Sequence, residues 1–225
     1  MDKFISIAID GPSGAGKSTV AKQIAKRFNF KYADTGAIYR TVAYAAVCNN
    51  ISYENENEVK CLLESQNIEL KYDNDNVQIM YLNGTDVSSF IRTPQISTVA
   101  SQISALPVVR KYLLDMQRSL ALNNNIVMDG RDIGTVVLPE ADIKIFLTAS
   151  INVRAKRRYD ELIDKGLNVE LDSILNDMKL RDDADTTRKE SPLKIADDAI
   201  LVDTSNLGLD ESIDTICELI KSILE

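Results

Sequence analysis

The sequence contains no histidine, and this absence removes a large group of catalytic mechanisms. Ser-His-Asp and Cys-His schemes need an imidazole as the general base, so both are excluded. Any catalysis must use lysine, arginine, aspartate, serine, threonine or a metal ion. Phosphoryl transfer fits this limit, because positioning and charge neutralisation carry most of that reaction.

Cysteine is also scarce, and long apolar runs are absent. Cys48, Cys61 and Cys217 are odd in number and widely spaced, without a Cys-x-x-Cys pair. We expect buried thiols in a reducing compartment, and therefore a cytoplasmic protein, not a disulfide framework or a zinc site. No apolar run approaches the ~20 residues needed to span a bilayer. Met1 and Asp2 lead almost directly into an apolar segment, which leaves no room for a signal peptide.

Positively charged residues are fewer than negatively charged ones, and the net charge is −8. The hydrophobic fraction of 44% is enough for an ordinary core. An acidic chain disfavours bulk binding of nucleic acid, which usually needs a basic face. The basic residues nevertheless cluster locally at Arg154, Lys156, Arg157 and Arg158. A local cluster of this kind suits a small anionic ligand.

A glycine-rich segment follows the apolar run 4–9 and precedes a helical pattern. Strand, glycine-rich turn and helix form the context of a phosphate-binding loop, whose backbone N–H groups surround an anion. Lys17 can reach the β- and γ-phosphates, and the Ser18 hydroxyl can ligate Mg²⁺. We expect this segment to bind ATP through Gly11, Pro12, Ser13, Gly14, Ala15, Gly16, Lys17, Ser18 and Thr19.

The remaining pattern predicts an α/β fold. Near-continuous apolar strands at about 125–130, 143–147 and 199–203 alternate with helical segments, which indicates a parallel sheet covered by helices on both faces. Between residues ~66 and 90 the period changes from 3.6 to 2, with a turn at 73–76. We interpret that stretch as a small antiparallel sheet inserted into the βα framework.

Further candidate residues lie at strand ends and on helix faces. Asp129 ends an apolar strand and is placed to hold Mg²⁺ directly or through water, although a simple Asp-Gly turn remains the alternative. Arg154, Arg157 and Arg158 share one helix face, which is either solvated or closes over a polyphosphate. Arg181, Asp185 and Arg188 share another face if their helix continues that far, and exposed salt bridges are the alternative there.

The most specific segments of the chain are 11–18, 34–40, 83–87, 91–94, 130–137 and 181–185. Taken together, these segments closely resemble the bacterial cytidylate kinase family over essentially the whole chain. The phosphate loop alone indicates only binding of a nucleoside triphosphate. The Gly-Arg-Asp-x-Gly-Thr segment and the antiparallel insert narrow the resemblance to this family.

The resemblance implies one nucleoside monophosphate kinase domain over 1–225, with a five-stranded parallel core, an acceptor-binding lobe and a short helical lid. The implied boundaries are core 1–35, 99–150 and 190–225, lobe 36–98 and lid 151–189. The implied reaction transfers the γ-phosphoryl group of ATP, with Mg²⁺, to CMP or dCMP in pyrimidine nucleotide metabolism. We expect a monomer without nucleic-acid or membrane partners.

The resemblance also assigns site residues. It implies catalytic roles for Lys17, Arg131, Asp132 and Arg188. It implies that the CMP site is lined by Ser13, Thr35, Arg40, Ser101, Arg110, Arg131, Asp132, Arg181, Asp185 and Arg188. Ser101 and Arg110 would read the cytosine, Asp185 would meet the ribose, and Arg40, Arg131 and Arg188 would hold the α-phosphate. Many relatives have serine where this chain has Thr35, whose extra methyl group could alter the fit of the acceptor.

Two alternatives stay open. A kinase of this type could phosphorylate another nucleoside monophosphate or a small alcohol, because a few side chains decide the acceptor. A nucleotide-dependent switch is the other alternative. The chain lacks the Asn-Lys-x-Asp segment of guanine-specific switches, and arginines around a second anion site have little use in a switch.

Overall fold

The structure is a computed structural model that describes residues 3–74 and 76–224. The expectations about Met1 and Asp2, and one residue of the predicted 73–76 turn, Asp75, lie outside this range. A five-stranded sheet has the order β2-β6-β1-β7-β8, and a separate three-stranded sheet has the order β3-β4-β5. β1 pairs in parallel with β7, and β7 with β8, whereas β3, β4 and β5 pair antiparallel. The predicted α/β class with an antiparallel insert is therefore confirmed.

The chain divides into two compact units: Met1–Phe4 with Lys31–Ile126, and Ile5–Phe30 with Val127–Glu225. The first unit contains β2 (Lys31–Asp34), α2 (Thr35–Cys48), α3 (Glu56–Ser65), β3 (Ile68–Tyr72), β4 (Gln78–Leu82), β5 (Thr85–Asp86), α4 (Pro94–Ile103) and α5 (Pro107–Leu122). The finer division into core, lobe and lid stays a prediction.

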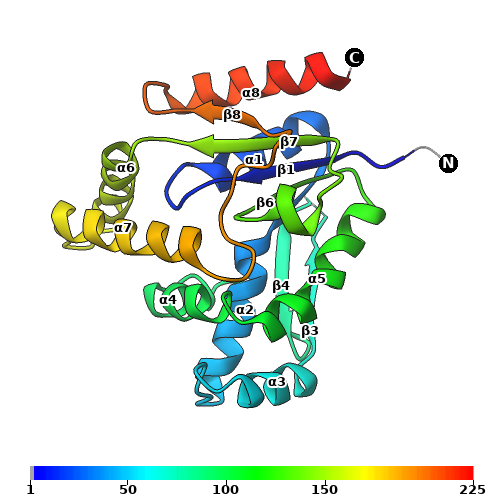
Figure 1. Cartoon of the computed structure of the whole chain (residues 1–225), viewed down its shortest axis with the longest axis vertical. Helices are drawn as coiled ribbons and strands as arrows, with labels where there is room; N and C mark the ends of the chain where they lie inside the picture. The colour runs from blue at the N-terminus through cyan, green and yellow to red at the C-terminus, as the bar shows by residue number, and fades with distance from the viewer. Residues whose placement is uncertain (1–2, 75, 225) are drawn as a thin grey trace. The chain divides into compact units, whose positions relative to one another are not determined.

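The second unit carries the phosphate loop and most of the large sheet. Its elements are β1 (Ser6–Asp10), α1 (Lys17–Phe28), β6 (Ile126–Gly130), the π-helix η1 (Ile133–Val137), β7 (Ile143–Thr148), α6 (Ile151–Asp164), α7 (Leu171–Thr187), β8 (Ile200–Asp203) and α8 (Leu209–Leu224). Figure 1 shows α6 and α7 side by side, and α8 packs against α1. None of the helices in the described part of the chain is both long and apolar enough to cross a bilayer.

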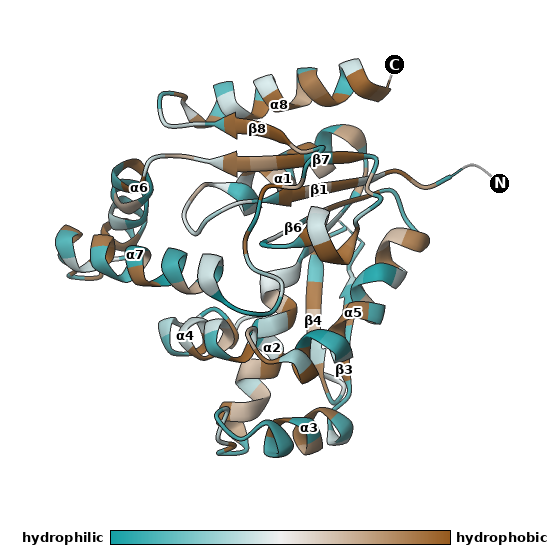
Figure 2. Ribbon diagram, viewed as in Figure 1, coloured by the Kyte–Doolittle hydropathy of each residue, from teal (hydrophilic) through white to brown (hydrophobic). Residues whose placement is uncertain are grey.

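Hydrophobic burial explains the strands of the second unit. β1 and β7 are mostly apolar and nearly fully buried, and brown stretches mark them in Figure 2. Ile7, Ile9, Ile145 and Leu147 are all at most 1% exposed. Strands buried on both faces lose the polar alternation of a half-exposed strand, which is why the sequence predicts parallel pairing here.

Local capping residues begin the helices of the first unit. Asp34 accepts a hydrogen bond from the Ala37 N–H and caps α2, and the Asn55 side chain caps α3. Pro94 and Pro107 occupy the first turns of α4 and α5, where a missing N–H costs nothing. The amphipathic helices and the inner face of the small sheet bury one apolar cluster within this unit.

Two details differ from the sequence-based expectations. η1 follows β6 directly, although no helical pattern indicated it, because a single π-turn has no periodic signal. Only Cys217 is buried, while Cys48 and Cys61 are exposed, so the expectation of three buried thiols is wrong for two of them. Cys48 ends α2, and Cys61 lies on the outer face of α3. All three are free thiols.

Candidate active site

The phosphate loop lies after β1, at the carboxyl end of the sheet of the second unit. Gly11 has a φ of 148°, and a Cβ atom there would lie 2.0 Å from the Leu147 carbonyl oxygen. Gly14 has a φ of 74°, and a Cβ atom there would lie 2.4 Å from the end of the Met178 side chain. Glycine is required at Gly11, because a Cβ atom would overlap the backbone of β7. At Gly14 the left-handed φ favours glycine, whereas the flexible end of Met178 can move away.

Lys17 is the first residue of α1, and its amine donates a hydrogen bond of 2.7 Å to the Pro12 carbonyl within the loop. Burial lowers the pKa of this amine well below its ordinary value, and the charges of Arg131 and Arg181 lower it further. The carboxylates of Asp129 and Asp10 act in the opposite direction. An anion such as a triphosphate would relieve this concentration of positive charge.

Ser18 and Asp129 form the pair expected for a magnesium site. The Ser18 hydroxyl donates to Asp129 Oδ2 over 2.9 Å. Within residues 3–74 and 76–224, no group of three or more histidine, cysteine, aspartate or glutamate side chains could hold a metal. A hydroxyl and one carboxylate fit Mg²⁺, which takes one or two protein oxygens and completes its shell with phosphates and water.

Arginines and aspartates interlock between the end of β6 and helix α7. Arg131 Nε lies 2.7 Å from Asp185 Oδ2. Arg188 lies 3.6 Å from Asp132 and 3.8 Å from Asp185, and its Nε donates to the Ser191 carbonyl. Burial raises the pKa of Asp185, but the charges of Arg131, Arg181 and Arg188 outweigh burial and hold it below its usual range. The structure thus brings together four of the predicted acceptor residues.

Helix α7 explains this grouping. It runs to Thr187, and Arg188 caps its end, so the predicted single face of Arg181, Asp185 and Arg188 exists. Asp185 is 5% exposed. The alternative of exposed helix salt bridges is therefore wrong for Asp185 and Arg188.

One buried carboxylate in this region has no place among the predicted site residues. Asp10, the last residue of β1, accepts hydrogen bonds from the backbone N–H groups of Ile133 and Gly134, at 2.8 and 2.7 Å. Burial raises its pKa to about 6. Asp10 thereby fixes the segment that follows Arg131 and Asp132. The sequence signal for such a role is a carboxylate that ends an apolar strand directly before the glycine-rich loop.

The α6 arginines make different contacts, although they share one helix. Arg154 is buried. Its guanidinium donates hydrogen bonds to the Ala149 and Ser13 carbonyls over 2.8 and 2.9 Å and forms an ion pair of 2.7 Å with Asp182. Arg157 donates to Thr204 and the Leu207 carbonyl in the turn after β8. Arg158 pairs with Glu161 near the surface. ATP contacts by these three stay a prediction.

The first unit holds four further predicted acceptor residues, Thr35, Arg40, Ser101 and Arg110, whereas Ser13 and Arg181 lie in the second unit. Arg40 lies 2.8 Å from Asp34 Oδ2, and Thr35, which begins α2, is buried. Arg110 donates to the Ser104 carbonyl over 2.9 Å and stacks over the Tyr39 ring. These contacts fix the direction of both arginines. Ser101 is half-buried on α4, three residues before Ser104.

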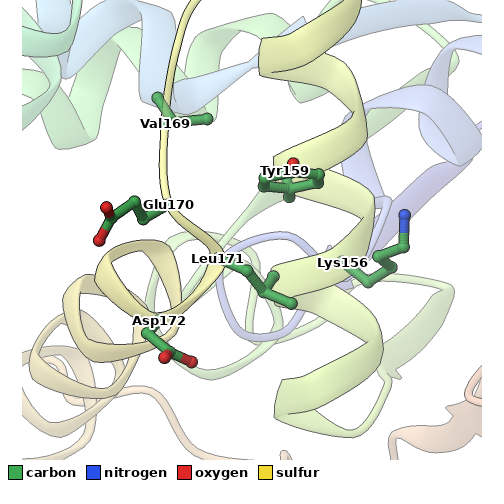
Figure 3. A pocket seen from close by; sticks show the side chains of 6 residues that line it. All are labelled: Lys156, Tyr159, Val169, Glu170, Leu171 and Asp172. Carbon is green, nitrogen blue, oxygen red and sulfur yellow. The ribbon is translucent and has the colours of Figure 1, made fainter.

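A surface pocket in the second unit lies apart from these groups. Figure 3 shows it between α6 and the segment that leads into α7. Its lining residues are Lys156, Tyr159, Val169, Glu170, Leu171 and Asp172. None of the predicted site residues contributes to it. The pocket is therefore no candidate for the phosphate site.

A family profile and the sequence relatives of this chain indicate the same family. The profile of the family described as cytidylate kinase matches residues 7–222. The chain is 51% identical over 214 residues to a cytidylate kinase of Carboxydothermus hydrogenoformans, which covers 95% of this chain and 96% of the relative. It is 45% identical over 223 residues to a cytidylate kinase of Fusobacterium nucleatum, which covers 99% of this chain and 100% of the relative.

Similarity to solved structures adds information about the fold only. An uncharacterised protein from Eubacterium ventriosum covers 98% of this chain and 99% of its own length, with a TM-score of 0.52 and 19% identity. At that identity the likeness concerns the fold. The full-length profile match and the sequence relatives together show that this chain belongs to the cytidylate kinase family.

Proposed function

We propose that this enzyme transfers the γ-phosphoryl group of ATP to CMP or dCMP, forming ADP and CDP or dCDP. One observation carries the proposal most directly. The unit that contains the phosphate loop also holds a buried cluster of arginines, Arg131 and Arg188, around Asp185. A triphosphate site needs one set of cations, and a second set suits a second anion.

On the donor side, the backbone of the phosphate loop and Lys17 would hold the phosphates of ATP. Ser18 and Asp129 would hold Mg²⁺, either directly or through water, and their 2.9 Å contact supports this assignment. When bound, the metal neutralises charge on the β- and γ-phosphates. The exposed part of the α6 arginine face, at Arg158, remains the better candidate for a direct contact with ATP than buried Arg154.

On the acceptor side, Arg131, Arg188 and Arg40 would hold the α-phosphate of the acceptor, and Asp185 would accept hydrogen bonds from the ribose. Ser101 and Arg110 would read the cytosine edge, since stacking on Tyr39 already orients Arg110. The acceptor site would be completed by Ser13, Thr35, Asp132 and Arg181.

The chemistry needs no strong general base. An anionic oxygen of the acceptor α-phosphate attacks the γ-phosphorus, a new P–O bond forms, and the bond to the β–γ bridging oxygen breaks as ADP leaves. The main barrier is the approach of two anions, which the arginines and Lys17 reduce by neutralising charge. The absence of histidine is therefore no obstacle to this reaction.

ADP release with Mg·ATP should be measured against CMP, dCMP, UMP, AMP and GMP. We expect strong turnover with CMP and dCMP. Turnover with another nucleotide would keep the mechanism and remove Ser101 and Arg110 as cytosine readers. ATP binding without turnover on any of the five would overturn the proposal and favour a small-alcohol kinase or a switch.

We further propose that the enzyme acts as a monomer in the cytoplasm without a nucleic-acid partner. The net charge of −8 and the exposed free thiols of Cys48 and Cys61 support this proposal. Light scattering of the purified protein would test it, and a dimer at micromolar concentration would contradict the monomer.

A further inference from the structure

The three-stranded sheet contacts the last residue of strand β2 through one side-chain amide. Gln78 is the first residue of β4, and Asp34 is the last residue of β2. Gln78 Oε1 accepts from the Asp34 backbone N–H over 2.7 Å, and Gln78 Nε2 donates to the Asp34 carbonyl over 3.2 Å. One side chain thus satisfies both backbone groups of Asp34, as a hydrogen-bonded residue on a neighbouring antiparallel strand would.

Asp34 passes this constraint on to the residues that follow it. Its Oδ1 accepts from the Ala37 N–H over 2.9 Å and fixes the start of α2. Its Oδ2 lies 2.8 Å from Arg40, one turn into the same helix. The position of the Asp34 backbone therefore sets both the first turn of α2, which includes Thr35, and the direction of the Arg40 guanidinium.

A second contact places the small sheet along β2. The Lys31 amine, at the start of β2, lies 4.6 Å from the centre of the Tyr72 ring and also contacts the Asn76 side chain. The sheet is thus attached near both ends of β2. Of these two contacts, the one made by Gln78 fixes the Asp34 backbone more closely, because one planar amide both accepts and donates a hydrogen bond there.

We propose that Gln78 is a positioning residue for the acceptor site, holding Asp34 so that Thr35 and Arg40 are correctly placed for a nucleoside monophosphate. The proposal rests on the proposed function. It assigns a role to the inserted sheet, which would act through this one amide without touching the acceptor.

Two substitutions test the proposal. Gln78→Met keeps the length of the side chain and removes both hydrogen bonds. Gln78→Glu keeps an acceptor for the Asp34 N–H but sets an oxygen against the Asp34 carbonyl. We expect each to raise the KM for CMP about tenfold, with the KM for ATP unchanged within about twofold. Gln95→Glu, an identical change at an exposed residue of α4, is the matched control.

A pH series separates positioning from general damage. A protonated carboxyl group can again donate to the Asp34 carbonyl. The KM of Gln78→Glu for CMP, relative to that of the wild type, should therefore fall as the pH is lowered from 8 to 5. Gln78→Met has no such group and should show a constant ratio. An unchanged KM for CMP in both variants, or an equal rise in both KM values, would overturn the proposal.

Hydrogen exchange keeps this test distinct from that of the proposed function. In either variant the amides of Asp34 and Ala37 should lose protection, while those of α5 stay protected. Wild type without activity on CMP would refute the proposed function. Active wild type with normal KM values in both variants, or unchanged protection at Asp34, would refute the role of Gln78 alone.

Discussion

Arg131 and Asp185 form a mostly buried ion pair of 2.7 Å between the segment after β6 and helix α7. The pair joins a residue proposed to hold the acceptor phosphate to one proposed to meet the ribose. Because Arg188 also approaches Asp185, one carboxylate restrains two arginines. Loss of that carboxylate should disturb both.

Asp185→Asn should therefore lower kcat/KM for CMP by at least about tenfold and lower the free energy of unfolding by about 3 kcal/mol, because buried arginine charge loses its partner. Steady-state kinetics and urea unfolding would measure the two effects. Asp183→Asn, two positions away and exposed, should leave both near wild type. Equal effects in the two variants would show that charge on α7, not this pair, is what matters.

Asp10 makes stability depend on pH. Because its pKa rises from 3.8 unfolded to about 6 folded, the native protein binds more protons between these values, and stability falls as pH rises through that window. Relative to Asp10→Asn, the wild type should lose about 2 kcal/mol of unfolding free energy between pH 4 and pH 7. Chemical denaturation of both proteins across this range would measure it, and parallel curves would contradict the shift.

Asp129→Asn should raise the Mg²⁺ concentration needed for half-maximal activity by at least about tenfold, because a neutral amide binds the hydrated cation less well. Titration of Mg²⁺ at saturating ATP would measure it. Glu140→Gln, an exposed change in the loop before β7, is the control. An unchanged Mg²⁺ dependence would remove Asp129 from the metal site.

Arg154→Met should lower the free energy of unfolding by about 2 to 4 kcal/mol, since three hydrogen-bonded groups lose a buried partner. Arg158→Met, which loses only a surface pair, should change stability by less than about 1 kcal/mol. Thermal unfolding would compare them. If Arg154→Met instead kept its stability and raised only the KM for ATP, the side chain would act on the nucleotide.

Gly11→Ala should destabilise the protein by at least about 2 kcal/mol and abolish ATP binding, because the new methyl group would overlap the Leu147 carbonyl. Gly208→Ala adds the same atom where nothing lies within 4 Å. That control should stay within about 0.5 kcal/mol of wild type. Calorimetric ATP titration and thermal unfolding would test both.

The sequence predicted the elements whose signal is local. The phosphate loop, the apolar strands and the alternating insert each follow from composition and period. The sequence also proposed Ser18 and Asp129 for one metal site, since ligands of α/β sheets gather at the carboxyl ends of strands. The structure places these two side chains in contact, and their metal role stays a prediction. These rules need no knowledge of individual side-chain conformations.

Contacts that depend on tertiary packing could not be predicted. One helix face places Arg154, Arg157 and Arg158 together, yet burial divides them between the phosphate loop, the turn after β8 and the surface. Asp10 and Gln78 act on backbone groups of distant residues, which no spacing rule reveals. Nor does the sequence distinguish the buried Cys217 from the exposed Cys61.

The close approach of Gly11 to Leu147 has a consequence for synthesis on the ribosome. The phosphate loop is translated before the strand against which it packs, and more than a hundred residues separate the two. Residues 31–126 form a nearly continuous unit and can fold as soon as they emerge. The second unit is discontinuous, so β1 must wait for β7. Although β1 and the phosphate loop are translated before residues 31–126, their packing is completed later.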